Sequence, residues 1–126
     1  MRPKTLAEVA QLAADGDSFD RCLANFLDEF YAAPNVAALS PRPDLLTPKL
    51  GEVGQVEDAY LAATAEHLAY ANGFPIPSWV ADEERKLHKP WFASPLAALR
   101  AVLILESPVA FRSRNIFISE NALTRA

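Results

Sequence analysis

The sequence predicts an all-α fold: a single compact domain over residues 1–126, with five or six helices, a proline-rich connection and a C-terminal lid segment. Three observations predict this class. Apolar residues recur at helical spacing in two long segments, alanine is abundant, and no two alternating apolar runs are joined by a hairpin turn. A chain of 126 residues has the length of one domain and can bury roughly two-thirds of its unfolded surface.

Capping residues mark the first two helices. Thr5 and Glu8 have the spacing of a capping box, which predicts a short helix over residues 6–14. Ser18 provides the next N-cap, and Pro34 ends the helix that follows it. The apolar residues of this second helix recur at helical spacing and are Phe19, Cys22, Leu23, Phe26, Leu27 and Phe30.

Prolines and glycines divide the rest of the chain. Four prolines between residues 33 and 53 predict an ordered connection with at most one helical turn near residues 36–39. The next helix should occupy residues 52–72, because Gly73 suits the left-handed end of a helix. Two Ser-Pro pairs then predict a helix over residues 95–106 and a short one through Phe111. A last turn or two is expected over residues 120–125.

Composition places the chain among ordinary soluble globular proteins, with 51% hydrophobic residues, 22% charged residues and a net charge of −4. The lone Cys22 and the absence of a secretory apolar segment predict a cytoplasmic location. The apolar run over residues 95–105 is interrupted by Arg100 and is too short to cross a membrane. Nucleic-acid binding is disfavoured, because the chain is acidic and shows neither a basic recognition helix nor zinc-finger spacing.

Catalytic groups are scarce, so an enzyme is the less favoured class. Tyr60, Glu66 and His67 form the alternative candidate site, which would serve a small ligand or acid-base chemistry between helices. The two histidines are 21 positions apart and have no cysteine companion, which predicts neither a metal site nor a cofactor. The charge run over residues 82–87 predicts a short helix with a solvated face.

Aromatic and arginine side chains outside the regular helices are the candidate partner-binding residues. Trp79, Trp91 and Phe92 lie in proline-bounded segments, where such rings either seal a loop onto the core or anchor a protein interface. Arg112 and Arg114 belong to a C-terminal stretch whose charge balance is +2, against −6 for residues 1–106. This stretch is either a lid on the core or a surface that contacts a partner.

Three segments carry a resemblance to a known group of proteins: SFDRCLANFLDEFY, SWVADEERKLHKPWFASP and SPVAFRSRNIFISENALTRA. They resemble small bacterial helical proteins of uncharacterised function that are associated with toxin–antitoxin-like loci beside nucleotidyltransferase genes. The resemblance implies an antitoxin-like partner of a co-encoded protein and carries no site residues with it. The favoured hypothesis is therefore a non-enzymatic protein-binding domain, with a protein partner or a homo-oligomer as its complex.

Overall fold

The computed structural model describes residues 2–119 and 121–125, which form six α-helices, four 3-10 helices and two strands of two residues. This confirms the all-α class. The elements in chain order are α1 (Leu6–Ala14), α2 (Phe19–Ala32), η1 (Val36–Ala38), α3 (Thr47–Leu50), α4 (Glu52–Asn72), η2 (Ser78–Ala81), η3 (Glu83–Arg85), β1 (Trp91–Phe92), η4 (Ala97–Leu99), α5 (Arg100–Glu106), α6 (Val109–Arg112) and β2 (Ile116–Phe117).

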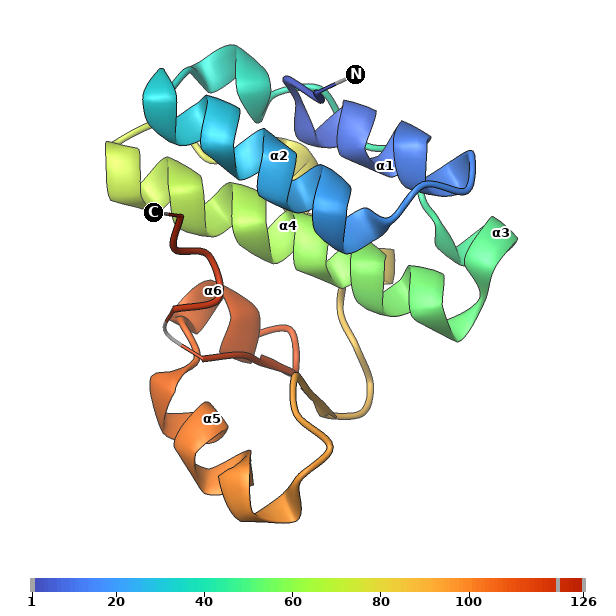
Figure 1. Ribbon diagram of the computed structural model, residues 1–126, viewed down its shortest axis with the longest axis vertical. Coiled ribbons are helices and arrows are strands. Elements are labelled where there is room, and N and C mark those ends of the chain that lie inside the picture. The colour runs from blue at the N-terminus through green and yellow to red at the C-terminus, as the bar shows by residue number, and fades with distance from the viewer. Residues whose placement is uncertain (1, 120, 126) are drawn as a thin grey trace.

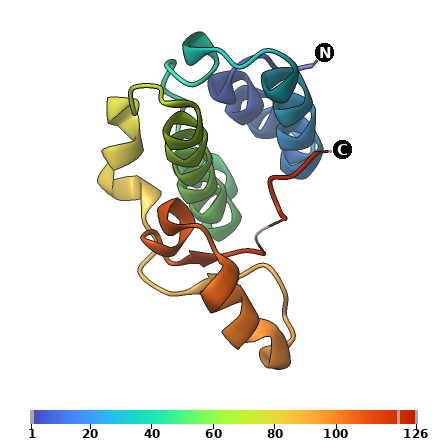
Figure 2. The same ribbon diagram turned by 90° about the vertical axis from the view of Figure 1, so that its left-hand side faces the viewer.

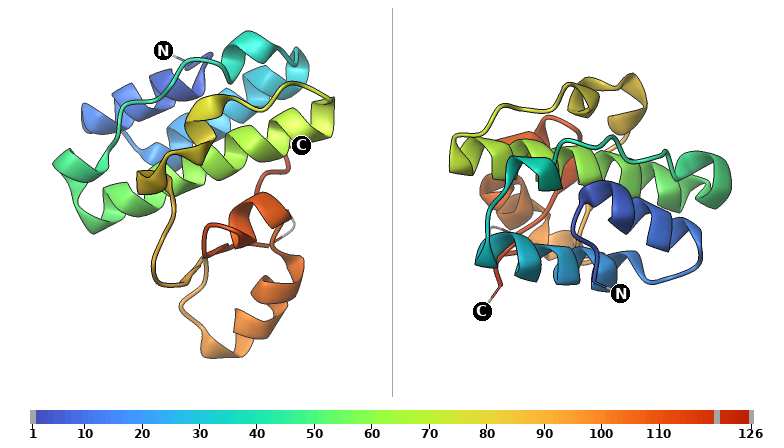
Figure 3. Two further views of the ribbon diagram at one scale, coloured as in Figure 1. Left: turned by 180° about the vertical axis from the view of Figure 1, so that it is seen from behind. Right: turned by 90° about the horizontal axis from the view of Figure 1, so that it is seen from above.

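Helix α4 is the central element of the fold (Figure 1). Helices α1 and α2 pack against each other on one side of it, and the segment that carries η2 and η3 crosses its other side (Figures 2 and 3). Helices α3 and α6 also pack on α4, and ten of its residues are buried. A helix enclosed by neighbours on several sides needs small apolar side chains, which explains its five buried alanines.

The local signals at the ends of the long helices are confirmed. The Thr5 hydroxyl accepts a hydrogen bond from the Glu8 amide, and the Glu8 carboxylate accepts one from the Thr5 amide. The Ser18 hydroxyl accepts a hydrogen bond from the Arg21 amide at the start of α2. Gly73 has φ 67° and ψ 24°, the left-handed conformation that favours glycine at a helix end.

The less regular elements differ from the sequence expectations. Helix α3 was not predicted, and the expected helix over residues 95–106 begins as η4 and becomes α-helical only at Arg100. The charged helix expected over residues 82–87 is reduced to η3. Residues 121–123 form a turn, and Glu120 of the expected last helical turn lies outside the described residues.

The C-terminal segment is built into the core rather than lying on the surface. Phe111 and Ile116 are completely buried; α6 packs mainly on α4, whereas β2 contacts α5, α6 and β1 as well as α4. This burial is what the lid interpretation of the C-terminal stretch predicts, and α2 meets the last described residues. The Tyr31 hydroxyl donates to the Leu123 carbonyl oxygen at 2.8 Å, and Arg125 pairs with Asp28 on α2.

Candidate functional site

The most unusual surface of the molecule is an exposed apolar patch on and around α5. Helix α5 lies at the end of the molecule furthest from α1 and α2 (Figures 1 and 2). Six large apolar side chains in this region are each more than two-fifths exposed, and we call them the α5 patch: Leu96, Leu99, Val102, Ile104, Leu105 and Val109. Within α5, the one buried residue is Leu103.

Helix α5 is nevertheless held firmly to the body at both of its ends. At its N-terminal end, the Arg100 guanidinium carbon lies 5.0 Å from the centroid of the Phe92 ring, which in turn stacks on Phe117. At its C-terminal end, the Ser107 hydroxyl is buried, donates to the Ile116 carbonyl oxygen and accepts from the Ile118 amide. The patch therefore lies on a helix that contacts the body of the protein at both ends.

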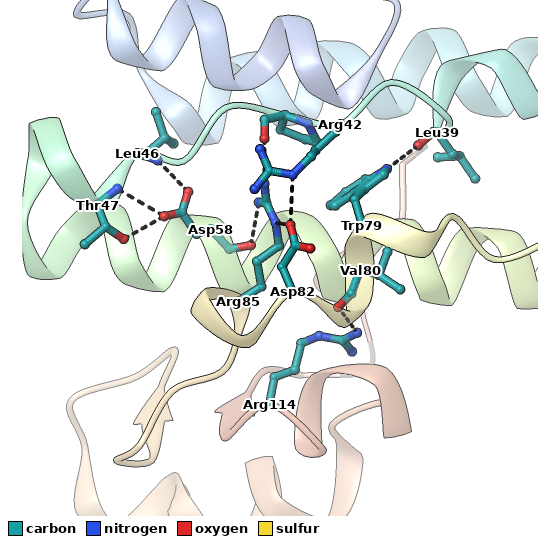
Figure 4. Close-up of polar contacts among 11 residues, drawn as sticks. Leu39, Arg42, Leu46, Thr47, Asp58, Trp79, Val80, Asp82, Arg85 and Arg114 are labelled. Atoms are coloured by element: carbon teal, nitrogen blue, oxygen red, sulfur yellow. Dashed lines mark hydrogen bonds and ion pairs between the residues drawn. The ribbon is translucent and has the colours of Figure 1, made fainter.

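Two of the predicted partner-binding residues, Trp79 and Arg114, belong to the interior. Trp79 is 5% exposed, and its indole N–H donates to the Leu39 carbonyl oxygen at 3.0 Å (Figure 4). Arg114 is 4% exposed and donates to the carbonyl oxygens of Ala110 and Val80. Both side chains are buried and donate to carbonyl oxygens inside the fold, although the Nε of Arg114 has no hydrogen-bond partner among the described residues, so neither side chain is available on the surface of this structure.

The other three predicted partner-binding residues lie nearer to the surface. Trp91 and Phe92 are partly buried because β1 pairs in parallel with β2, with Trp91 opposite Ile116 and Phe92 opposite Phe117. Arg112 is exposed at the end of α6. Thus the predicted set does not form one surface.

The alternative site of Tyr60, Glu66 and His67 is divided by Phe111. The Phe111 ring centroid lies 5.0 Å from that of Tyr60 and 6.4 Å from that of His67, because Phe111 packs between them along α4. Glu66 is engaged in an ion pair with Arg114 at 3.0 Å. Burial lowers the pKa of His67 below its ordinary value of 6.5, which favours the neutral ring. Glu66 and His67 border one pocket of about 450 Å³, whereas Tyr60 faces another.

Sequence reasoning missed the polar cluster beneath the proline-rich connection. The Asp58 carboxylate is completely buried and accepts hydrogen bonds from the amides of Leu46 and Thr47 and from the Thr47 hydroxyl (Figure 4). Arg85 is also completely buried, although the sequence placed it on a solvated helix face. This cluster stabilises the fold, because its charged groups contact protein atoms rather than a cavity that a ligand could enter.

Comparisons with known proteins do not add a functional assignment. The chain matches no protein-family model, and neither the curated proteins nor the solved structures yield a match. None of the helices in the described part of the chain has both the length and the apolar character that a bilayer crossing requires. Among residues 2–119 and 121–125, no group of three His, Cys, Asp or Glu side chains is placed to hold a metal ion.

Proposed function

We propose that this chain is a non-enzymatic protein-binding domain, and that it binds a second copy of itself through the α5 patch. The observation that carries the proposal is the exposure of an apolar helix on nearly all sides. A helix that is apolar all round is normally buried, and α5 has five consecutive apolar residues, 101–105, of which Leu103 alone is covered. A covering surface is therefore expected.

The size of the patch supports a protein partner. Its six side chains expose an area on the order of 500 Å², near the upper end of the largest apolar patch on typical monomers. Patches of this size usually mark a binding site for another protein or for a membrane. Most of the patch lies on or beside α5, and Val109 alone among its residues lines one of the two pockets described above, whereas small-ligand sites are concave.

A second copy is the occupant that the patch fits best. A stable interface buries about 800 Å² on each partner, with an apolar core and a more polar rim. The α5 patch provides the apolar core, and the exposed Ala98, Ala101 and Arg100 beside it supply the remaining area and a charged edge. Two copies of α5 packed across a two-fold axis would cover the same apolar residues on both chains at once.

Sedimentation velocity over a range of protein concentrations tests this proposal. We expect a monomer–dimer equilibrium that the substitution Leu105→Asp shifts strongly to the monomer. Leu105 is 81% exposed in the monomer, so its replacement leaves the folded monomer stable, while burial of each such side chain is worth about 1.5–3 kcal/mol. Because a two-fold interface contains the residue twice, the loss should exceed roughly a hundredfold in the dimerisation constant.

Val36→Asp is the control, because Val36 is 40% exposed but lies on η1, at the end of the molecule opposite α5 (Figure 1). It should leave the equilibrium unchanged. The proposal is wrong if the unmodified chain remains monomeric at every concentration, or if both substitutions weaken association equally.

A co-encoded protein is the alternative binding partner for the α5 patch, as the sequence resemblance suggested. In that case the purified chain would be monomeric alone, and co-expression would give a mixed complex that Leu105→Asp abolishes.

A further inference from the structure

A second feature, separate from the α5 patch, is a pocket of about 610 Å³ between the start of α2, the first half of α4 and strand β1. Its size is within the range of small-molecule sites. Three aromatic rings contribute to its walls, from Phe19, Tyr60 and Trp91. The pocket shares no residue with the α5 patch, so it stands independently of the self-association proposed above.

The charged side chains that line this pocket all favour a positively charged ligand. Asp20, Glu52 and Glu57 line it, and none of the lining residues is a lysine, arginine or histidine. The electron-rich faces of aromatic rings also attract cations, and rings combined with carboxylates form the usual recognition site for organic ammonium groups. An anionic ligand would be repelled by the same side chains.

Glu57 has an unsatisfied hydrogen-bonding atom beside this pocket. Its Oε1 atom is buried and has no hydrogen-bond partner among residues 2–119 and 121–125. Buried acceptors of this kind are uncommon, and each lacks the stabilisation that a donor would give. The neighbouring Asp20 and Asp58 carry the same charge and supply no donor to it. Because this atom has almost no accessible surface in the structure, a ligand N–H group would become its donor once rotation of the Glu57 carboxylate turns the atom toward the pocket.

We propose that this pocket binds a small organic amine with an apolar body. The ammonium group would lie against the carboxylate of Glu57, and the apolar part would pack on the rings of Phe19, Tyr60 and Trp91. Asp20 and Glu52 would add long-range attraction at the mouth, since both are exposed. The site requires no metal ion and no covalent step.

The proposal gives amine binding a defined dependence on pH. Burial, together with the charges of Asp20 and Asp58, raises the pKa of Glu57 to about 7. The other titratable groups that line the pocket are Glu52 and Tyr60 on α4, while the lining residues from β1 and the C-terminal segment do not titrate. A protonated amine binds the ionised form of Glu57, so its affinity should rise between pH 6 and pH 8 as Glu57 loses its proton.

The test is isothermal titration calorimetry of the full chain with three probes of similar shape: benzylamine, benzyltrimethylammonium and benzyl alcohol. We expect benzylamine to bind at least tenfold more tightly than benzyl alcohol at pH 8. Its affinity should increase several-fold between pH 6 and pH 8. Benzyltrimethylammonium should bind with intermediate affinity, because it carries the charge but has no N–H donor for Glu57.

The substitution Glu57→Gln should reduce benzylamine affinity about tenfold and abolish its pH dependence, while leaving the weak binding of benzyl alcohol unchanged. Glu84→Gln, which alters an exposed carboxylate outside this pocket, is the matched control and should change neither property. Equal affinities for benzylamine and benzyl alcohol, unchanged amine binding by Glu57→Gln, or no saturable binding of any probe would each overturn the proposal. Trp91 lines the pocket, so a bound amine should quench its fluorescence, which gives a second readout. The fluorescence of Trp91 would remain unchanged if the amine bound elsewhere.

Discussion

The guanidinium carbon of Arg85 lies 4.9 Å from the centroid of the Trp79 ring, and the two side chains are 0% and 5% exposed. The same guanidinium donates to the carbonyl oxygens of Pro43 and Asp58 and pairs with the Asp82 carboxylate at 3.4 Å. One buried cation therefore joins the proline-rich connection, α4 and the segment containing η2 and η3. This arrangement fixes that segment on α4 (Figure 4).

Replacing Arg85 by alanine should destabilise the protein by about 3–5 kcal/mol, because removing one member of a buried charged cluster leaves its partners without compensation. Two buried carbonyl oxygens would lose their donor, and Trp79 would lose a packing partner. Urea denaturation followed by circular dichroism measures the change. Lys86→Ala is the control, because Lys86 is the exposed neighbour and its loss should cost under about 0.5 kcal/mol. Equal midpoints for the two variants would refute the structural role of Arg85.

Substitution of the two arginines of the C-terminal stretch should change the stability of the protein by very different amounts. Arg114→Ala removes the donor to the Ala110 and Val80 carbonyl oxygens and leaves Glu66 unpaired, which should cost at least about 2 kcal/mol. Arg112→Ala alters an exposed side chain and should change stability by less than about 0.5 kcal/mol. Thermal melting of both variants checks the difference. Indistinguishable melting temperatures would show that Arg114 does not have the buried contacts described.

Glu57 should make the folded state less stable as the pH rises. Its pKa is raised to about 7 in the folded chain from an ordinary value of 4.5, so the native state holds the proton more tightly than the unfolded state does. The raised pKa of Glu57 therefore adds to the free energy of unfolding. This contribution is complete below about pH 4.5 and is lost as the pH rises through 7. Relative to Glu57→Gln, the unmodified chain should therefore lose stability between pH 5 and pH 8.

Urea midpoints of the two proteins at several pH values give this comparison directly. The difference between them isolates Glu57 from groups such as His67, whose lowered pKa makes stability fall as the pH drops below its ordinary value of 6.5. A difference that stays constant from pH 5 to pH 8 would mean that Glu57 has an unperturbed pKa.

Helix positions were predictable because their signals are local. The bounds of α1 and α4 match the sequence prediction, since a capping box and a C-terminal glycine act within a few residues of the helix end. The 3-10 turn η1 was expected for the same reason. By contrast, α3 depends on Asp58, whose carboxylate accepts hydrogen bonds from the amides of Leu46 and Thr47, twelve and eleven positions away. Such a long-range cap has no local pattern.

The candidate sites were less predictable, because exposure depends on which segments meet in space. Trp79 and Arg114 had the residue types of an interface, but carbonyl oxygens from distant elements bind both of them inside the protein. The α5 patch did have a signal in the sequence, since five consecutive apolar residues exceed what one buried helix face needs. The sequence predicted that run as part of a helix over residues 95–106 and excluded it as a membrane segment, but did not predict its exposure. No sequence pattern indicated a site at Glu57, because the residues that surround its pocket come from three separate elements, α2, α4 and β1.

The most direct test of the central claim is cysteine crosslinking at the centre of the α5 patch. A two-fold interface over this patch would bring residue 105 of one chain close to residue 105 of the other. The native Cys22 is buried, so the unmodified chain serves as the blank and should not react with a short bismaleimide reagent. Val36→Cys places an exposed thiol on η1, far from the patch. We expect Leu105→Cys to give a covalent dimer at concentrations where the chain self-associates, and Val36→Cys to remain monomeric. If the two variants crosslink to the same extent, α5 is not the interface and the proposed function is wrong.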